Sequence, residues 1–178
     1  MHVLVYAHLG ALINIEELHY RLESGSMPDC VLPRLRFLIY GPPYSASTTA
    51  FLVNHPHIEG LHFLAGTIVP HATCGVGSLK MHALTSFIGP GAVLEALELD
   101  SCLNDALIRW PDDAEGRDYE AALRALRPSA QRICRLSCSQ SLWDIRLFPV
   151  IAKYLPTLPN IRFHVLISNQ GVRVLLMC

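Results

Sequence analysis

Charge is scarce in this sequence, and neither sign dominates. Charged side chains make up 16% of the 178 residues, and the 14 lysine and arginine residues nearly balance the 15 aspartate and glutamate residues. A net charge of −1 and a pI near 6.7 provide no overall positive field. Because phosphate contacts supply most of the affinity for nucleic acids, we expect no nucleic-acid partner.

Long apolar runs and a secretory leader are also missing. Mean hydropathy is high at +0.32, but the stretch Phe148–Leu158 contains Lys153 and is shorter than the roughly 20 residues that cross a bilayer. Residues 1–13 are apolar without a basic leader segment, which favours a buried first helix. We therefore expect no membrane partner. Six cysteines in such a chain indicate reduced thiols and a cytoplasmic or nuclear location.

The sequence motifs of several enzyme classes are absent as well. There is no G-x-S-x-G sequence, and the segment after Gly41 lacks the second glycine and the lysine of a phosphate-binding loop. The acidic residues between 112 and 118 lack calcium-loop spacing. We expect no metal, no cofactor and no catalysis, since the candidate zinc ligands have no paired spacing: His55, His57, His62, His71 and Cys74. A cysteine–histidine pair that forms only in space stays open.

Internal repeats are the main positive feature of the sequence. Leu32-Pro-Arg-Leu-Arg-Phe recurs as Leu158-Pro-Asn-Ile-Arg-Phe, and Ile15-Glu-Glu-Leu-His-Tyr recurs as Ile58-Glu-Gly-Leu-His-Phe. Ile133-Cys-Arg-Leu-Ser-Cys has the same L-x-x-L-x-L-like pattern, and weaker copies start at Met81 and Leu103. The spacing is roughly 17 to 30 residues, averaging about 24, when these anchors are used: Leu18, Leu35, Leu61, Leu84, Ala106, Leu136 and Ile161.

This spacing predicts an α/β fold of the leucine-rich-repeat type over residues 1–178, a short solenoid of about seven strand–helix units. Helices are expected at Ser47–Asn54, Gly91–Leu97, Asp118–Arg127 and Ser141–Leu155, with Pro149 as a kink or break. Residues 66–77 form the best candidate loop. Alternating strands and helices predict a mostly parallel sheet, and the short period places all helices on one side of an arc.

Three segments resemble the repeat region of fungal F-box-like proteins: Leu32–Gly41, Ala50–Leu64 and Arg135–Phe148. In that family the F-box docks onto the adaptor subunit of a cullin-type ubiquitin ligase, while the repeats recruit the substrate. The resemblance therefore implies a substrate-recognition module. No F-box segment is recognisable in this sequence, so the ligase adaptor is an expected partner only if an F-box lies outside this chain.

The concave face of the predicted sheet is the candidate binding surface. Side chains of a strand alternate between its two faces, so the residues one and three positions after each anchor are expected on the concave face. They are His19, Arg21, Arg36, Leu38, His62, Leu64, Phe87, Arg109, Arg162 and His164. Arginine and histidine around an apolar stripe of Leu38, Leu64 and Phe87 are typical of an interface centre. We expect this face to bind an acidic or mixed-polarity protein segment.

Other interpretations of the same residues stay open. In one alternative, the face is only the water-exposed side of a sheet and binds no partner. Its apolar stripe would then be covered by neighbouring repeats or by flanking segments of a longer chain. An α/β enzyme fragment is a second alternative, and it would gather polar groups at the carboxyl ends of the strands. A truncated paralogue without independent function is a third. The apolar segments at both ends of the chain favour a fragment of a longer repeat protein.

Overall fold

A computed structural model describes residues 14–21, 26–42, 44–64, 79–100, 102–111, 114–140, 144–166 and 173–177. The helix expected in residues 1–13 and the loop expected at 66–77 lie outside these ranges.

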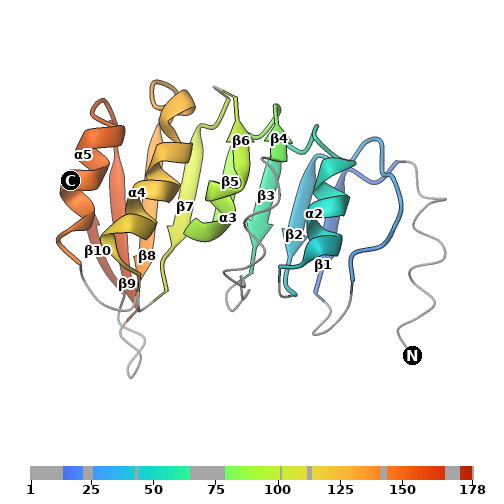
Figure 1. The fold of residues 1–178 in the computed structure, drawn as a ribbon, viewed down its shortest axis with the longest axis horizontal. Helices are drawn as coiled ribbons and strands as arrows, with labels where there is room; N and C mark the ends of the chain where they lie inside the picture. The colour runs from blue at the N-terminus through green and yellow to red at the C-terminus, as the bar shows by residue number, and fades with distance from the viewer. Residues whose placement is uncertain are drawn as a thin grey trace.

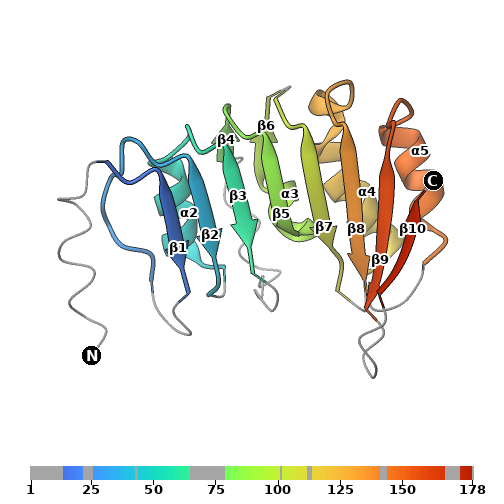
Figure 2. The ribbon, with the colours of Figure 1, turned by 180° about the vertical axis from the view of Figure 1, so that it is seen from behind.

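An eight-stranded sheet forms the centre of the molecule (Figures 1 and 2). Its strands, in spatial order, are β1 (Glu17–Tyr20), β2 (Phe37–Tyr40), β3 (Gly60–Phe63), β5 (Ser86–Pro90), β7 (Asp105–Arg109), β8 (Arg135–Gln140), β9 (Ile161–Leu166) and β10 (Arg173–Met177). All neighbouring strands are parallel except β9 and β10, which are antiparallel. The prediction of a mixed α/β fold with a mostly parallel sheet is confirmed.

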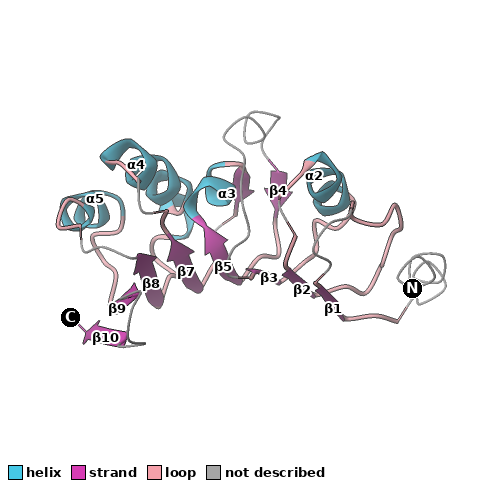
Figure 3. Cartoon of the chain, turned by 90° about the horizontal axis from the view of Figure 1, so that it is seen from below, coloured by secondary structure: helices cyan, strands magenta, loops and turns pink. Residues whose placement is uncertain are grey.

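The helices lie on one side of this sheet, and the strands follow an arc beneath them (Figure 3). They are α2 (Ala46–Val53), α3 (Gly91–Glu95), α4 (Gly116–Ala125) and α5 (Leu147–Tyr154), with a 3₁₀ turn at Arg127–Ser129. Two short strands, β4 (Leu79–Met81) and β6 (Leu97–Leu99), pair with each other on the same side. Short parallel crossovers therefore leave the opposite side of the sheet without a described helix.

The helix boundaries differ from the predictions in an informative way. Ser45 caps α2 through its side chain, which accepts a hydrogen bond from Thr48 N. The helix α5 begins at Leu147, six residues later than predicted, and the predicted cap Ser141 lies outside the described residues. Pro149 consequently occupies the first turn of α5, where its missing N–H has no intrahelical partner to lose. It starts a helix and does not kink one.

One backbone contact recurs at five successive strand junctions. At each junction, one carbonyl oxygen just before a strand accepts hydrogen bonds from two consecutive backbone N–H groups of the next repeat. The residue that supplies this oxygen lies two positions before the first side chain of the strand that faces the helices. Glu16 O accepts from Arg36 N and Phe37 N at 2.8 and 2.9 Å, and Arg36 O accepts from the next pair at 2.7 and 2.9 Å. The oxygens of Glu59, Thr85 and Asn104 repeat this arrangement. The strands β1, β2, β3, β5, β7 and β8 therefore enter the sheet in the same register.

The core is built from one triad of positions per repeat, which the register stacks into rows. The triads are Ile15/Leu18/Tyr20, Leu35/Leu38/Tyr40, Ile58/Leu61/Phe63, Leu84/Phe87/Gly89, Leu103/Ala106/Ile108, Ile133/Leu136/Cys138 and Leu158/Ile161/Phe163. Aromatic rings contact one another along the third position. Tyr20 and Tyr40 stack with ring centroids 5.9 Å apart, and Tyr40 meets Phe63 edge to face with centroids 5.7 Å apart.

Two predicted surface residues belong to this core. Leu38 and Phe87 are both 0% exposed and face the helices. The anchors Leu35 and Leu84 hold the first position of their triads, three residues before the position occupied by the other anchors. An odd shift exchanges the two faces of a strand, so the prediction that Leu38 and Phe87 line the concave face is wrong.

Gly89 fills the third triad position because two aromatic rings occupy the space of a side chain. A Cβ atom there would lie 2.7 Å from Phe63 Cδ2 and 2.9 Å from Phe87 Cζ. Gly89→Ala should therefore lower the free energy of unfolding by about 1–3 kcal/mol, measured by urea denaturation.

Gly116→Ala is the matched control, since a Cβ atom at that position in α4 would meet nothing within 4 Å. It should be neutral or slightly stabilising because alanine favours helix. Equal effects of the two substitutions would contradict this account of Gly89.

Candidate binding face

The side of the sheet opposite the helices, here called the open face, carries the candidate site (Figure 2). Three rows of side chains cross it, each made by residues in register. The amino row is Glu17, Phe37, Gly60, Ser86, Asp105 and Arg135; the middle row is His19, Ile39, His62, Ile88, Leu107, Ser137 and Arg162. The carboxyl row, formed where the strands end, is Arg21, Gly41, Leu64, Pro90, Arg109, Ser139 and His164.

Charges in and beside the amino row are paired with one another. The Asp105 carboxylate lies 3.1 Å from Arg135 Nη1, and the Glu17 carboxylate lies 2.5 Å from His19 Nε2. Such exposed pairs add little stability, but they leave little net charge at this edge.

Arg36 also lies at the amino edge, directly before β2, and does not project from the middle of the open face. It donates from Nε and Nη2 to the two carboxylate oxygens of Glu59 at 2.8 and 2.7 Å. This contact raises the pKa of Arg36 and lowers the pKa of Glu59. Because its fork of donors is occupied, the structure does not support Arg36 as a residue offered to a partner.

Apolar side chains lean over two glycines of the open face. A Cβ atom on Gly60 would lie 2.4 Å from Phe37 Cδ1, and one on Gly41 would lie 3.2 Å from Leu64 Cδ1. Phe37 is still 37% exposed, and Leu64 is partly exposed. The glycines thus let large apolar groups lie flat on this surface.

Arg109 compensates for a gap in the backbone ladder. At the two preceding junctions the residue at the carboxyl end donates to the previous strand, as Gly41 N does to Tyr20 O (2.8 Å) and Leu64 N does to Tyr40 O (2.7 Å). The corresponding residue on β5 is Pro90, which has no N–H. The side chain of Arg109 instead donates from Nη1 to Phe63 O.

This role leaves Arg109 half-buried, and no described acidic side chain forms an ion pair with it. Burial is the one cause that lowers its pKa. One of its five N–H donors bonds Phe63 O.

His62 occupies the middle of the open face and is held neutral. Its Nε2 lies 3.1 Å from the Ser86 hydroxyl. Burial lowers the pKa of His62, the positive charge of Arg109 lowers it further, and the carboxylates of Asp105 and Glu17 partly offset both effects. At neutral pH this residue is a polar but uncharged contact.

The structure therefore brings together seven of the ten predicted surface residues on the open face. His19, His62 and Arg162 lie in the middle row, and Arg21, Leu64, Arg109 and His164 lie in the carboxyl row. The apolar stripe that the sequence analysis missed is Ile39, Ile88 and Leu107, all partly exposed. Anchoring each repeat on the second apolar residue of its triad would have found it.

Polar groups lie at both ends of the described strands. The pairs Glu17–His19 and Asp105–Arg135 lie at the amino ends, whereas Arg109, Ser139 and His164 lie at the carboxyl ends. Within the described ranges no three histidine, cysteine, aspartate or glutamate side chains are grouped as metal ligands. His71 and Cys74 lie outside those ranges. None of the helices in the described part of the chain is long and apolar enough to cross a membrane.

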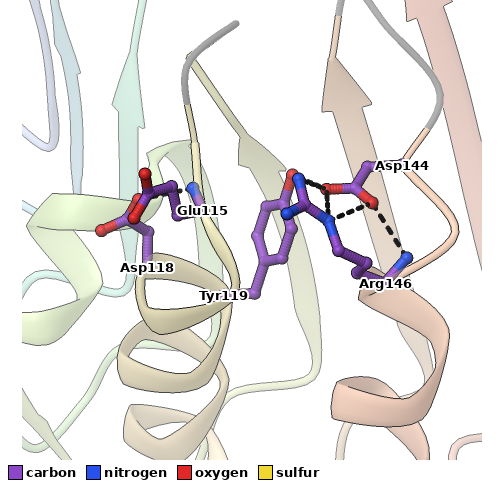
Figure 4. A network of polar contacts seen from close by, with 5 residues as sticks. All are labelled: Glu115, Asp118, Tyr119, Asp144 and Arg146. Atoms are coloured by element: carbon purple, nitrogen blue, oxygen red, sulfur yellow. Dashed lines mark hydrogen bonds and ion pairs between the residues drawn. The ribbon is translucent and has the colours of Figure 1, made fainter.

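A polar network does lie near the carboxyl end of β8, between α4 and α5 (Figure 4). The Tyr119 hydroxyl donates to Asp144 Oδ2 at 2.9 Å, and Arg146 donates to the same carboxylate from its backbone N and its Nε. Arg146 holds the pKa of Asp144 at about 2, while burial and then Asp144 raise the pKa of Tyr119 to about 12. Neither group changes its protonation near neutral pH, and the network joins α4 to the residues directly before α5.

Comparison with family models, with curated proteins and with solved structures finds no match for this chain. The resemblance to F-box-like repeats stays a prediction.

The contact between Arg109 and Phe63 can be tested by a double-mutant cycle. Arg109→Met should lower the free energy of unfolding by about 1–3 kcal/mol, because it leaves the Phe63 carbonyl group without a donor. Pro90→Ala restores a backbone N–H, so the same substitution should cost clearly less in that background. Additive effects in urea denaturation would show that Arg109 does not replace the proline donor.

Acid should weaken the fold through two histidines. Buried His55 accepts a hydrogen bond from Leu32 N at 2.8 Å and donates from Nδ1 to Phe51 O at 2.6 Å, so it must be neutral. Its pKa is lowered by burial, against the bond to Phe51, and lowered further by His57.

The pKa values of His55 and His62 both lie below the ordinary value of 6.5, so the unfolded chain takes up these protons first. The free energy of unfolding should therefore fall as the pH drops below about 6.5, before carboxylates begin to titrate. Urea denaturation at several pH values gives the free energy of unfolding as a function of pH. In a variant with both His55→Gln and His62→Gln, this free energy should fall less steeply as the pH is lowered. An unchanged slope would refute the assignment.

Proposed function

We propose that this chain is a leucine-rich-repeat-like interaction module whose open face binds an extended segment of another protein. The recurrent buried triad, the one-sided helix layer and the repeated strand junction support the leucine-rich-repeat part of the proposal. The binding part rests on one observation: the middle row sets the partly exposed Ile39, Ile88 and Leu107 between polar residues, and the described helices all lie on the other side of the sheet.

The composition of the open face fits a protein ligand. Partly exposed aliphatic side chains offer area to bury, and each buried aliphatic residue adds about 1.5–3 kcal/mol. The surrounding arginine and histidine side chains provide hydrogen-bond donors for specificity. A wide, shallow sheet face accommodates an extended chain, which crosses several strands and contacts each of them.

The resemblance to F-box-like repeats extends the proposal to a biological role. The open face would then recruit the substrate of a ubiquitin-ligase receptor, in the cytoplasm or the nucleus. The ligase adaptor would contact an F-box outside this chain. Free thiols at Cys30, Cys102, Cys134 and Cys138 are consistent with a reducing compartment.

The proposal can be tested with a displayed library of random peptides selected on the immobilised chain. Peptides enriched on the natural chain should bind Ile88→Asn at least tenfold more weakly, since the substitution removes apolar contact area from the centre of the open face. Binding is measured by fluorescence anisotropy after circular dichroism confirms that the variant is folded.

Ile145→Asn is the matched control, because Ile145 is 69% exposed next to α5 and lies away from the open face. It should leave peptide binding unchanged. Failure to enrich any peptide, or equal losses in the two variants, would overturn the proposal.

A further inference from the structure

The strand β1 forms one edge of the sheet, and no described strand pairs with its outer side (Figure 2). Its inner side is bonded to β2 along the whole strand. At the amino end, Glu16 O accepts from Phe37 N, and the register then continues without a break. At the carboxyl end, Tyr20 O accepts from Gly41 N. The even-numbered residues of β1 therefore direct their backbone groups toward β2.

Alternation turns the backbone groups of the odd-numbered residues outward. These residues are Glu17, His19 and Arg21, and each has one N–H and one C=O group on the outer side of the strand. None of these groups has a hydrogen-bond partner in the described part of the chain. The edge thus presents the alternating donors and acceptors through which an extended chain adds to a sheet.

The edge lacks the features with which proteins block strand addition. Proline, lysine and β-bulges on an edge strand prevent a further strand from pairing. β1 contains neither of the two residue types, and all four of its residues pair with β2 in an unbroken register. Strand addition is therefore compatible with both the backbone and the sequence of this edge.

The apolar core, by contrast, is already closed at this end of the sheet. Tyr20 is only 5% exposed, because its ring stacks on Tyr40 and its hydroxyl donates to Ser26 O at 2.7 Å. Met27 in the same loop is also buried, and Figure 3 shows this loop on the helix side of β1. A single extended segment fits beside β1. A second copy paired through its own β1 would bring another such loop to the same place.

The charges of the edge indicate the composition of the segment. Glu17 and Arg21 lie four positions apart on the same side of the strand. The contact of Glu17 with His19 uses one carboxylate oxygen, and no described acidic side chain forms an ion pair with Arg21. Opposite charges attract across neighbouring strands. A segment with one basic and one acidic residue, four positions apart, therefore matches both ends of the edge.

We infer that the outer edge of β1 is a second protein-binding site, which takes an extended segment of another protein as an added strand. Main-chain hydrogen bonds to Glu17, His19 and Arg21 hold the segment, and its basic and acidic side chains lie opposite Glu17 and Arg21. The site uses the backbone of the sheet edge, whereas the proposed function uses side chains in the middle of the open face. The inference therefore goes beyond the proposed function and does not depend on it.

Labelled synthetic peptides test the site. Each peptide is capped at both ends and contains one lysine and one glutamate four positions apart, in a threonine and valine background that favours extended chain. Both orders are made, because lysine precedes glutamate in a parallel strand and follows it in an antiparallel one. Fluorescence anisotropy should show that the natural chain binds one order about fivefold more tightly than a peptide with glutamine at both positions.

Backbone methylation distinguishes strand addition from binding through side chains. In an added strand every second N–H group of the peptide bonds to β1, and the others point away. Two versions of the better peptide therefore carry N-methyl groups on alternate residues. One version should bind roughly tenfold more weakly because it loses these donors, and the other should keep its affinity. Equal affinities of the two versions would overturn the inference.

The variant His19→Pro tests the same contact from the side of the chain. The N–H group of His19 points outward, so proline removes one donor from the edge and no hydrogen bond within the sheet. Peptide binding should weaken roughly tenfold. The matched control His19→Ala keeps the N–H group and should keep the affinity. Circular dichroism checks the fold of both variants, and the methylated peptides decide the question on the natural chain if the proline variant does not fold.

A charge reversal tests the composition of the segment. Arg21→Glu should bind a peptide with lysine in place of its glutamate more tightly than the original peptide. An unchanged preference in this variant would contradict the position assigned to the acidic side chain.

The outcomes separate this inference from the proposed function. Ile88→Asn changes the middle of the open face and should leave binding of these peptides unchanged. Peptides that bind His19→Pro fully but are lost on Ile88→Asn would overturn the edge site and would support the open face as the binding surface. Absence of binding by every peptide of the series would also overturn the edge site.

Discussion

Each junction from β1 to β8 is held by one carbonyl oxygen that accepts two N–H groups of the next repeat, and this contact determines which side chains face the helices. The side chains of a strand alternate between two faces, so a slip of one residue would exchange core and surface along the whole strand. Leu38 and Ile39 illustrate the consequence. They are adjacent aliphatic residues, yet the first is fully buried and the second lies on the open face. The core, the open face and the candidate site all follow from this register.

The same backbone ladder explains the contact between Arg109 and Phe63. Pro90 ends β5 and begins α3, which suits its fixed φ angle but removes one donor from the ladder. The Arg109 side chain crosses Pro90 to supply that donor to Phe63. The bond to Phe63 O thereby holds the Arg109 side chain in place at the carboxyl edge of the sheet.

The two edges of the open face differ in charge. The amino edge holds the pairs Arg36–Glu59 and Asp105–Arg135, which largely cancel each other. The opposite half of the face contains Arg109 and Arg162 with no acidic side chain in their rows. The residues on the helix side perform a different task. Tyr119, Asp144 and Arg146 join α4 to α5 through side-chain hydrogen bonds. The network on the helix side thus joins two helices, whereas the polar side chains of the open face lie on the other side of the sheet.

The sequence by itself determined that strands and helices alternate, that the sheet is mostly parallel and that most repeats bury a leucine-type residue, because hydrophobic period and spacing are local properties. It also placed His62, Arg109 and Arg162 on the open face. Only the tertiary structure decided the faces of β2 and β5. In Leu35-Arg-Phe-Leu-Ile-Tyr nearly every residue is apolar, so alternation alone does not distinguish the two faces, and the hydrogen bonds to neighbouring strands do. The pairing of Arg36 with Glu59 and of Arg109 with Phe63 O likewise joins residues 23 and 46 positions apart, a relation that exists only once the strands are side by side.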